Sequence, residues 1–165
     1  MKRSSILVAV VMAVLGGWET TPAASRISVH AAAAAATEIV GRPRVVDADT
    51  LDFAGRIVDL YGIVGPAPDQ TCRVEGRSWP CGMEARWAAI NRVGRHWVAC
   101  VPVERDSGAP RTGVIQAICY LAGRGGPELN AWLVARGWAL ADPATGGRYF
   151  AAESMARRAA RGLWR

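Results

Sequence analysis

The N-terminal segment decides how much of this 165-residue chain is available to fold. Lys2 and Arg3 precede an uninterrupted apolar run over residues 6–15, which glycines, polar residues and small residues follow. A basic start, a short apolar stretch and a small-residue exit are typical of a secretory signal peptide. Ten apolar residues span about 15 Å as a helix, half of a bilayer core, which disfavours a transmembrane anchor. The sequence therefore predicts a signal peptide over residues 1–25, with cleavage between residues 24 and 36.

The rest of the chain is expected to be one domain behind a short linker. Residues 26–42 contain an alanine tract and are expected to form a flexible spacer, and residues 43–165 have the length of one domain. Nothing else in the chain is long and apolar enough to span a membrane. We therefore expect a bacterial protein that is secreted or periplasmic, monomeric, and not attached to a membrane once the signal peptide is cleaved.

The charge of the mature part permits nucleic acid as a partner without demanding it. Residues 37–165 contain 17 arginines, no lysine and 13 acidic residues, a net charge of +4. Arginine binds phosphate through its planar, two-pronged guanidinium group. The alternative explanation is genomic composition, because a GC-rich genome favours arginine and alanine codons over lysine codons. If nucleic acid is bound, we expect arginine–phosphate contacts with a steep salt dependence. A protein partner is equally compatible with this charge.

The apolar pattern indicates a mixed fold. We interpret the order as three strands, a helix, two strands and two helices, with a loop that carries Cys72 and Cys81 before the first helix. This order is typical of a small Greek-key barrel of the OB type. The expected fold is therefore α+β, a five-stranded OB-fold Greek-key barrel with about three helices. Strand patterns cover residues 44–53, 57–64, 96–103, 114–121 and, briefly, 138–141, and helix patterns cover residues 83–93, 128–136 and 148–161.

Six segments along residues 43–165 share their order and spacing with one known family. They are Val46-Asp47-Ala48-Asp49-Thr50, Leu60-Tyr61-Gly62-Ile63, Pro68-Asp69-Gln70-Thr71-Cys72, Trp79-Pro80-Cys81-Gly82 with Ala85, the run from Leu129 to Ala139, and Glu153 with Ala156-Arg157 and Gly162-Leu163-Trp164. Together they resemble the secreted thermonucleases, the staphylococcal or micrococcal nuclease-like group. The resemblance implies an OB-fold barrel and an ancestral calcium-dependent hydrolysis of DNA and RNA phosphodiesters.

The resemblance also shows which functional groups this chain has lost. Asp49 falls on the first calcium ligand of the family. The second motif of the family reads Val-Arg-Leu-x-Gly-Ile-Asp-Ala-Pro-Glu. Here Asp59 replaces its phosphate-binding arginine, Val64 its second calcium carboxylate and Ala67 its catalytic glutamate. Arg111 is the candidate for the second arginine, in catalysis and in phosphate binding, although its loop is longer than in the family.

These losses predict an impaired enzyme. Removing a general base or an electrostatic stabiliser typically costs ~10²–10⁴ in rate, and Val64 offers no oxygen to a calcium ion. We expect a binding or structural module, with nucleic acid as one candidate ligand and no cofactor. Asp47 and Asp49 are then a solvated turn pair, and Asp49 is at most a residual calcium ligand. The alternative is an active calcium-dependent phosphodiesterase that cleaves DNA and RNA through other groups, in which case calcium is its cofactor.

The remaining candidate side chains have structural interpretations. Glu75 and Glu84 show no spacing that supports a catalytic role, and His96 is expected at the surface near a strand end. Glu153 and Arg157 are expected to form an ion pair on a helix surface. The tryptophans of the domain are expected to pack in the core or at its edge rather than to stack on bases. They include Trp87, Trp97, Trp132 and Trp138.

Four cysteines in an exported domain are expected to pair. Cys100 and Cys119 lie in two strands that a polar loop joins, and directly opposed residues of such a hairpin approach closely enough for a disulfide. Cys72 and Cys81 are nine residues apart, and a bond between them would pin the loop before the first helix. The resemblance supports the same pairs. We therefore expect disulfides Cys72–Cys81 and Cys100–Cys119.

Overall fold

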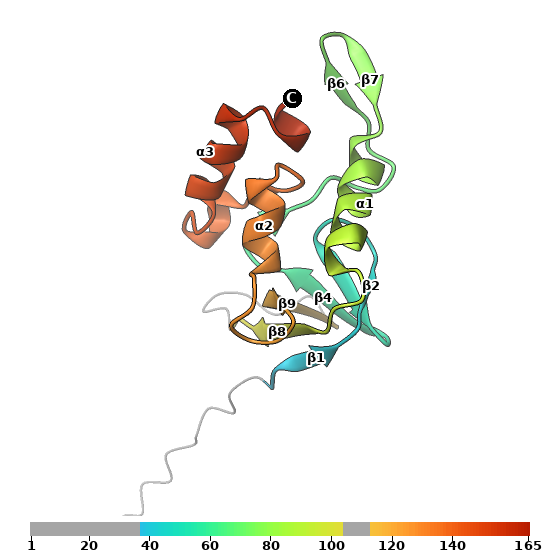
Figure 1. The fold of residues 1–165 in the computed structure, drawn as a ribbon, viewed down its shortest axis with the longest axis vertical. Helices are drawn as coiled ribbons and strands as arrows, with labels where there is room; N and C mark the ends of the chain where they lie inside the picture. Colours follow the sequence, from blue (N-terminus) through green and yellow to red (C-terminus); the bar gives the residue numbers. More distant parts are fainter. Residues whose placement is uncertain (1–36, 104–112) are drawn as a thin grey trace, which may run out of the picture. The chain divides into compact units, whose positions relative to one another are not determined.

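The computed structural model describes residues 37–103 and 113–165, which form an α+β domain with three α-helices (Figure 1). The predicted signal peptide and most of the predicted spacer lie outside the described residues. The strands are β1 (Ile39–Gly41), β2 (Arg44–Val45), β3 (Thr50–Phe53), β4 (Arg56–Leu60), β5 (Ile63–Val64), β6 (Cys72–Val74), β7 (Arg77–Trp79), β8 (Val98–Pro102), β9 (Val114–Leu121) and β10 (Leu140–Ala141). The helices are α1 (Cys81–Val93), α2 (Leu129–Ala135) and α3 (Phe150–Arg158), with 3₁₀ turns η1 (Pro143–Thr145) and η2 (Gly162–Trp164).

A curled six-stranded sheet with the order β1-β8-β9-β4-β3-β2 forms the centre of the domain. Its neighbours are antiparallel except for β4 and β9, which are parallel. The sheet has one strand more than the five predicted. One unpredicted strand is β1, which lies in the segment assigned to the spacer, so the ordered domain begins before residue 43. It is hard to recognise in the sequence, because its only β-prone residues are Ile39 and Val40. The strand predicted over residues 57–64 divides into β4, in this sheet, and β5, which pairs outside it with β10, the strand within the predicted range 138–141.

Two other sequence-based expectations need correction. The strand predicted over residues 44–53 is two short strands, because a bend at residues 47–49 separates β2 from β3. The loop predicted between Cys72 and Cys81 is a β-hairpin, in which β6 and β7 pair antiparallel around Glu75 and Gly76. Its strands have three residues each and bury little surface, so no apolar alternation announces them.

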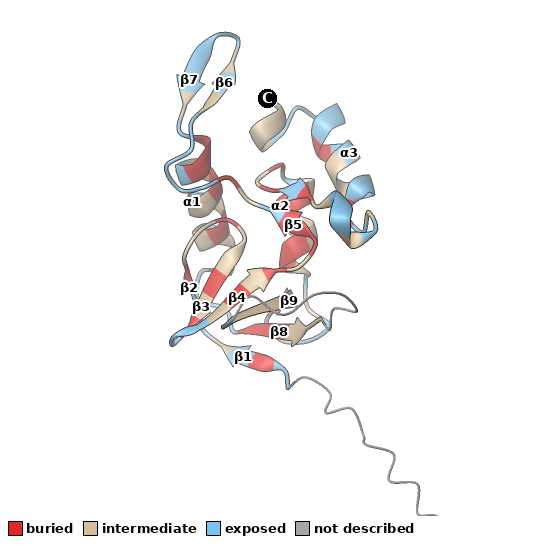
Figure 2. Ribbon diagram, turned by 180° about the vertical axis from the view of Figure 1, so that it is seen from behind, coloured by how far each residue is buried: buried red, intermediate tan, exposed pale blue. Residues whose placement is uncertain are grey.

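The core lies between the sheet and the helices, where α2 contacts β9 and α3, and α1 contacts β2 (Figure 2). Two tryptophans depart from the expected core or edge packing. The side chains of Trp87 and Trp97 are 55% and 53% exposed, whereas Trp132 and Trp138 are partly buried against the core. Within the described residues, no helix is long and apolar enough to cross a membrane. The largest fully buried apolar side chains are Leu51, Val58, Leu60, Val98, Leu129, Leu133 and Val134.

Both predicted disulfides are present. Cys100 and Cys119 are buried and face each other in the β8–β9 ladder. The Cys72–Cys81 bond joins the first residue of β6 to the first residue of α1, with a Cα–Cα distance of 5.6 Å. The Cys72–Cys81 bond therefore closes the base of the β6–β7 hairpin onto α1. Each bond removes conformations from the unfolded chain, which contributes about 2–4 kcal/mol to stability.

One buried amide side chain, that of Asn130, joins α2 to the sheet. Its Oδ1 accepts from the Cys119 backbone N–H at 3.1 Å, and its Nδ2 donates to the carbonyls of Tyr61 and Ala117 at 3.0 and 3.2 Å. The β4–β9 register ends at Leu60 and Ala117, so β4 leaves β9 at this point. Asn130 therefore provides partners for the Cys119 N–H and the Tyr61 carbonyl beyond the end of the ladder. It shares the Ala117 carbonyl with the Tyr61 N–H, which donates to the same oxygen at 2.8 Å.

This role predicts a large loss of stability when the amide is removed. Asn130→Ala deletes three hydrogen bonds and leaves buried polar groups unsatisfied, so the free energy of unfolding should fall by at least about 3 kcal/mol. Asn91→Ala is the matched control, because Asn91 is exposed on α1 and should change stability by less than about 0.5 kcal/mol. Urea unfolding measures both. Equal effects of the two substitutions would contradict the assigned role.

Candidate functional site

The bend between β2 and β3 holds Asp47 and Asp49. The Asp49 carboxylate accepts the backbone N–H of Gly65 at 2.6 Å, and the Asp47 carboxylate accepts the backbone N–H of Asp49 at 3.2 Å. The Asp49 carbonyl also accepts the N–H of Leu60 at 2.7 Å. Asp47 and Asp49 are both partly buried, so the expectation of a solvated turn pair needs correction. Asp49 is instead a structural link between the bend and the segment after β5.

Asp59 lies in the sheet beside the bend and is held from both sides. The register places it opposite Thr50 of β3 and Gln116 of β9. Thr50 Oγ1 donates to one carboxylate oxygen at 3.1 Å, and Gln116 Nε2 donates to the other at 3.2 Å. Both oxygens therefore have fixed partners. The position that the resemblance aligns with a phosphate-binding arginine carries an oriented negative charge.

Val64 and Ala67, the positions aligned with a calcium carboxylate and the catalytic glutamate, carry small apolar side chains at the surface. Val64 is 49% exposed in β5, where it pairs with Leu140 of β10, itself 37% exposed. Ala67 is also exposed, and its side chain ends at a methyl group. Neither residue supplies an oxygen, a proton acceptor or a charge from its side chain.

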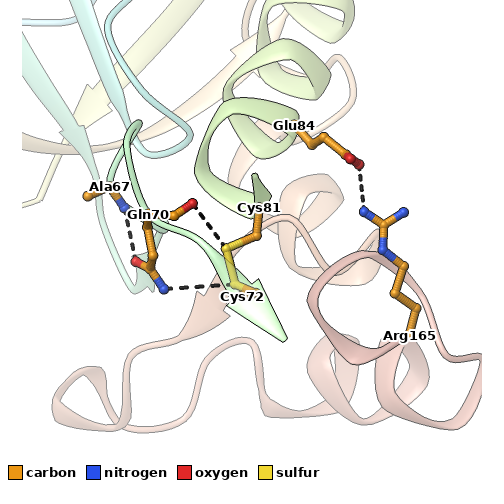
Figure 3. Close-up of a disulfide and its surroundings, with 6 residues drawn as sticks. All are labelled: Ala67, Gln70, Cys72, Cys81, Glu84 and Arg165. Carbon is orange, nitrogen blue, oxygen red and sulfur yellow. Dashed lines mark hydrogen bonds and ion pairs between the residues drawn. A yellow bond between two sulfur atoms is a disulfide. The ribbon is translucent and has the colours of Figure 1, made fainter. Parts of the chain in front are cut away.

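The backbone around Ala67 is nevertheless tightly held (Figure 3). The Ala67 carbonyl accepts the N–H of Gln70 at 2.9 Å, and the Gln70 side-chain oxygen accepts the N–H of Ala67 at 3.3 Å. The Gln70 carbonyl lies 3.4 Å from the Cys81 sulfur of the Cys72–Cys81 disulfide. A Cβ on Gly82 would lie 1.7 Å from the Ala67 carbonyl oxygen, so only glycine permits this approach. The loop is thus fixed in place without a functional side chain at Ala67.

The other candidate side chains do not gather at this site. Arg111 lies outside the described residues. Glu84 pairs with Arg165 at 2.6 Å, next to the hairpin, and Glu75 is at the exposed hairpin turn. His96 is exposed just before β8, as expected.

The predicted ion pair on α3 is present, and its glutamate also bonds the backbone of β10. Arg157 donates to Glu153 at 3.2 Å. The other carboxylate oxygen of Glu153 accepts the backbone N–H of Ala141 at 3.3 Å, which attaches α3 to β10. Glu153 is therefore engaged in the fold at both oxygens.

The residues around Asp49 do not fit a calcium ion. Calcium takes six to eight oxygen ligands, and carboxylates supply most of them in protein sites. Here Val64 supplies none, and an oxygen of each bend aspartate already accepts a backbone N–H. Across residues 37–103 and 113–165, no group of three or more His, Cys, Asp or Glu side chains has the geometry of a metal site.

Burial and the neighbouring carboxylates raise the pKa of Asp49. Its pKa rises from an ordinary 3.8 to about 7. Burial is the largest cause, because it penalises the charged form, and a hydrogen bond with the Asp47 side chain adds to it. The charges of Asp47 and Asp59 raise the pKa further, while the hydrogen bond from the Gly65 N–H lowers it. At mildly acidic pH the site is expected to hold a proton where a calcium site would hold a metal.

This shift predicts a pH-dependent stability with a definite sign. Between about pH 4 and pH 7 the folded protein binds a proton at Asp49 that the unfolded chain has released, so the free energy of unfolding falls as the pH rises. Asp49→Asn removes the titrating group and should flatten this fall. Melting temperatures at several pH values between 4 and 7, with EDTA present, measure the effect. Asp69→Asn is the control, since Asp69 is exposed, and the same pH slope in both variants would contradict the assignment.

Sequence reasoning singled out Asp49 and Asp59 but missed the partners that hold Asp59. Thr50 directly follows Asp49 in a quoted motif, so its place near the site was available from the sequence. Gln116 was not, because it lies 57 residues from Asp59 and reaches it only through the parallel β4–β9 pairing. The one signal was a polar side chain within the otherwise apolar strand over residues 114–121.

Comparison with known proteins places the chain in a family. It is 32% identical, over 136 residues, to the succinoglycan biosynthesis protein ExoI of Rhizobium meliloti (strain 1021), and the alignment covers 81% of this chain and 68% of ExoI. The chain belongs to the ExoI family. No family model matches it. The relationship to ExoI extends over most of the chain rather than over one motif.

Proposed function

We propose that this chain is an exported, thermonuclease-like protein without nuclease activity, which acts as a binding module in polysaccharide production. The motifs in thermonuclease order support the fold relationship. The relationship to ExoI, a protein named for succinoglycan biosynthesis, supports the process. The two disulfides support export, since such bonds persist in oxidising compartments.

The sheet supports a closed, five-stranded OB barrel in this proposal. Its two outer strands, β1 and β2, are consecutive in the chain and are separated only by Arg42 and Pro43. Proline lacks the N–H that a continuous ladder would use, so it interrupts one bent strand into two short segments. Counted as one strand, residues 39–45 pair with β8 at one end and with β3 at the other. The six short strands are then the five strands of a barrel.

Asp59 is the observation that carries the loss of nuclease activity. Its carboxylate is fixed by Thr50 and Gln116 where the family holds phosphate with an arginine. A phosphodiester brought to this place would meet like charge from the carboxylates of Asp59 and Asp47. Because the carboxylate is oriented on both sides, it cannot turn away without breaking two hydrogen bonds. The proposal therefore excludes phosphodiester hydrolysis at this site.

A cleavage assay tests this proposal. The purified mature protein should leave plasmid DNA and RNA intact in both calcium and EDTA, at concentrations where an ordinary thermonuclease degrades them. Cleavage that requires calcium and disappears in Asp49→Ala would establish the alternative, an active phosphodiesterase. A second variant checks the alignment itself: Asp59→Arg, Val64→Asp and Ala67→Glu together restore the aligned family residues. This triple variant should gain calcium-dependent cleavage over the parent, and no gain would count against the thermonuclease relationship.

A further inference from the structure

Two arginines from different helices converge on one tryptophan. The guanidinium carbon of Arg92, in the last turn of α1, lies 5.0 Å from the centroid of the Trp132 ring. The guanidinium carbon of Arg136, which ends α2, lies 5.9 Å from the same centroid. The two cations are therefore no more than about 11 Å apart, with the indole as their common contact.

The charge of this pair is not compensated within the described residues. No carboxylate there lies within ion-pair distance of Arg92 or Arg136. Both arginines lie at helix C-termini, where the exposed carbonyl ends favour positive charge and hold the cations in place. Two neighbouring guanidinium groups with unused donors suit an oxyanion, to which arginine donates in pairs.

A second arginine–tryptophan contact lies close by along the chain. Trp97 is 53% exposed, and the guanidinium carbon of Arg42 lies 5.6 Å from the centroid of its ring. Trp97 follows Arg92 by only five residues, so the Cα atoms of the two residues are at most about 18 Å apart. The exposed Arg95 lies between them in the sequence. The two contacts are thus within reach of one extended polymer.

These contacts are separate from the site around Asp59. The Ala122 N–H donates to the Trp97 carbonyl at 2.7 Å, which places Trp97 beside the end of β9. Gln116, the partner of Asp59, lies six residues earlier in the same run of chain, or about 20 Å at strand spacing. A ligand here need not approach the carboxylates of the bend.

We propose that Arg92, Arg136 and the Arg42–Trp97 pair bind an acidic polysaccharide, with the guanidinium groups donating to sugar carboxylates. This inference rests on the proposed function, because polysaccharide production supplies the polymer. The geometry favours it over single-stranded nucleic acid. Base stacking needs an open ring face, whereas Trp132 is partly buried and two guanidinium groups lie over its ring. The ligand then meets the edges of the guanidinium groups, which select for oxyanions.

The test compares two arginine pairs of equal charge. Arg92→Gln with Arg136→Gln removes the convergent pair, and Arg56→Gln with Arg77→Gln removes two exposed arginines elsewhere on the surface. Calorimetry measures binding of polygalacturonate, with neutral dextran and oligothymidylate as the other two arms. We expect the parent to bind polygalacturonate, and the first variant to bind it at least about tenfold more weakly, as loss of charge-assisted hydrogen bonds implies. The control variant should stay within about twofold of the parent, since surface charges away from the contact are screened.

Several outcomes would overturn the inference. They are no binding of polygalacturonate by the parent, equal weakening in both arginine variants, and tighter binding of oligothymidylate than of polygalacturonate. Arg136→Gln alone provides the same comparison if the double variant melts at a lower temperature, because Arg136 is exposed. A shift of the Trp132 indole N–H resonance on adding polygalacturonate is also expected, and an unmoved resonance would exclude this location. Cleavage assays on the same samples distinguish the two proposals. Nuclease activity would contradict the proposed function, whereas the polysaccharide site is tested by the binding measurements alone.

Discussion

The parting of β4 from β9 is the constraint on which the rest of the domain depends. Parallel strands share backbone hydrogen bonds only while they stay adjacent, and here the ladder ends at Leu60 and Ala117. Beyond this point the Asn130 side chain bonds the backbone, with Oδ1 accepting from Cys119 and Nδ2 donating to the carbonyls of Tyr61 and Ala117. Because Asn130 lies in the first turn of α2, the same three bonds that satisfy the sheet also fix the helix that covers it. Cys119, one of the bonded residues, is in turn tied to β8 by its disulfide.

The segment that leaves the sheet at this point carries Val64 and Ala67, the positions that the resemblance aligns with functional side chains of the thermonucleases. From Tyr61 the chain turns at Gly62, whose backbone φ of +82° suits glycine and whose Cα lies against the Tyr149 ring. It then passes Gly65, bonded to Asp49, and reaches Ala67, packed on Gly82. Each backbone position is held by a specific contact. In the proposed function, the difference from a thermonuclease therefore lies in the side chains at these positions and not in the backbone that holds them.

The sequence predicted the elements with strong periodicity and missed those without it. The strand over residues 114–121 coincides with β9, and the helix expected over residues 83–93 is α1 with two more residues at its start. Strand β1 and the β6–β7 hairpin escaped notice because three-residue strands carry too little pattern. The disulfide pairs followed from chain geometry. The hydrogen bonds of Asn130 and Gln116 could not be predicted from the sequence, because each joins strands or helices more than fifty residues apart in the chain.

A titration followed at one backbone amide tests the central claim, that the residues around Asp49 do not bind calcium. The Gly65 N–H donates to the Asp49 carboxylate, so its NMR resonance reports directly on any metal bound there. Calcium added to about 10 mM exceeds the ~10⁻⁴–10⁻³ M dissociation constants of extracellular calcium modules. The account predicts that the Gly65 resonance stays where it is at neutral pH throughout the titration. A saturable shift of that resonance, reversed by EDTA, would show that the site still binds calcium and would contradict the account.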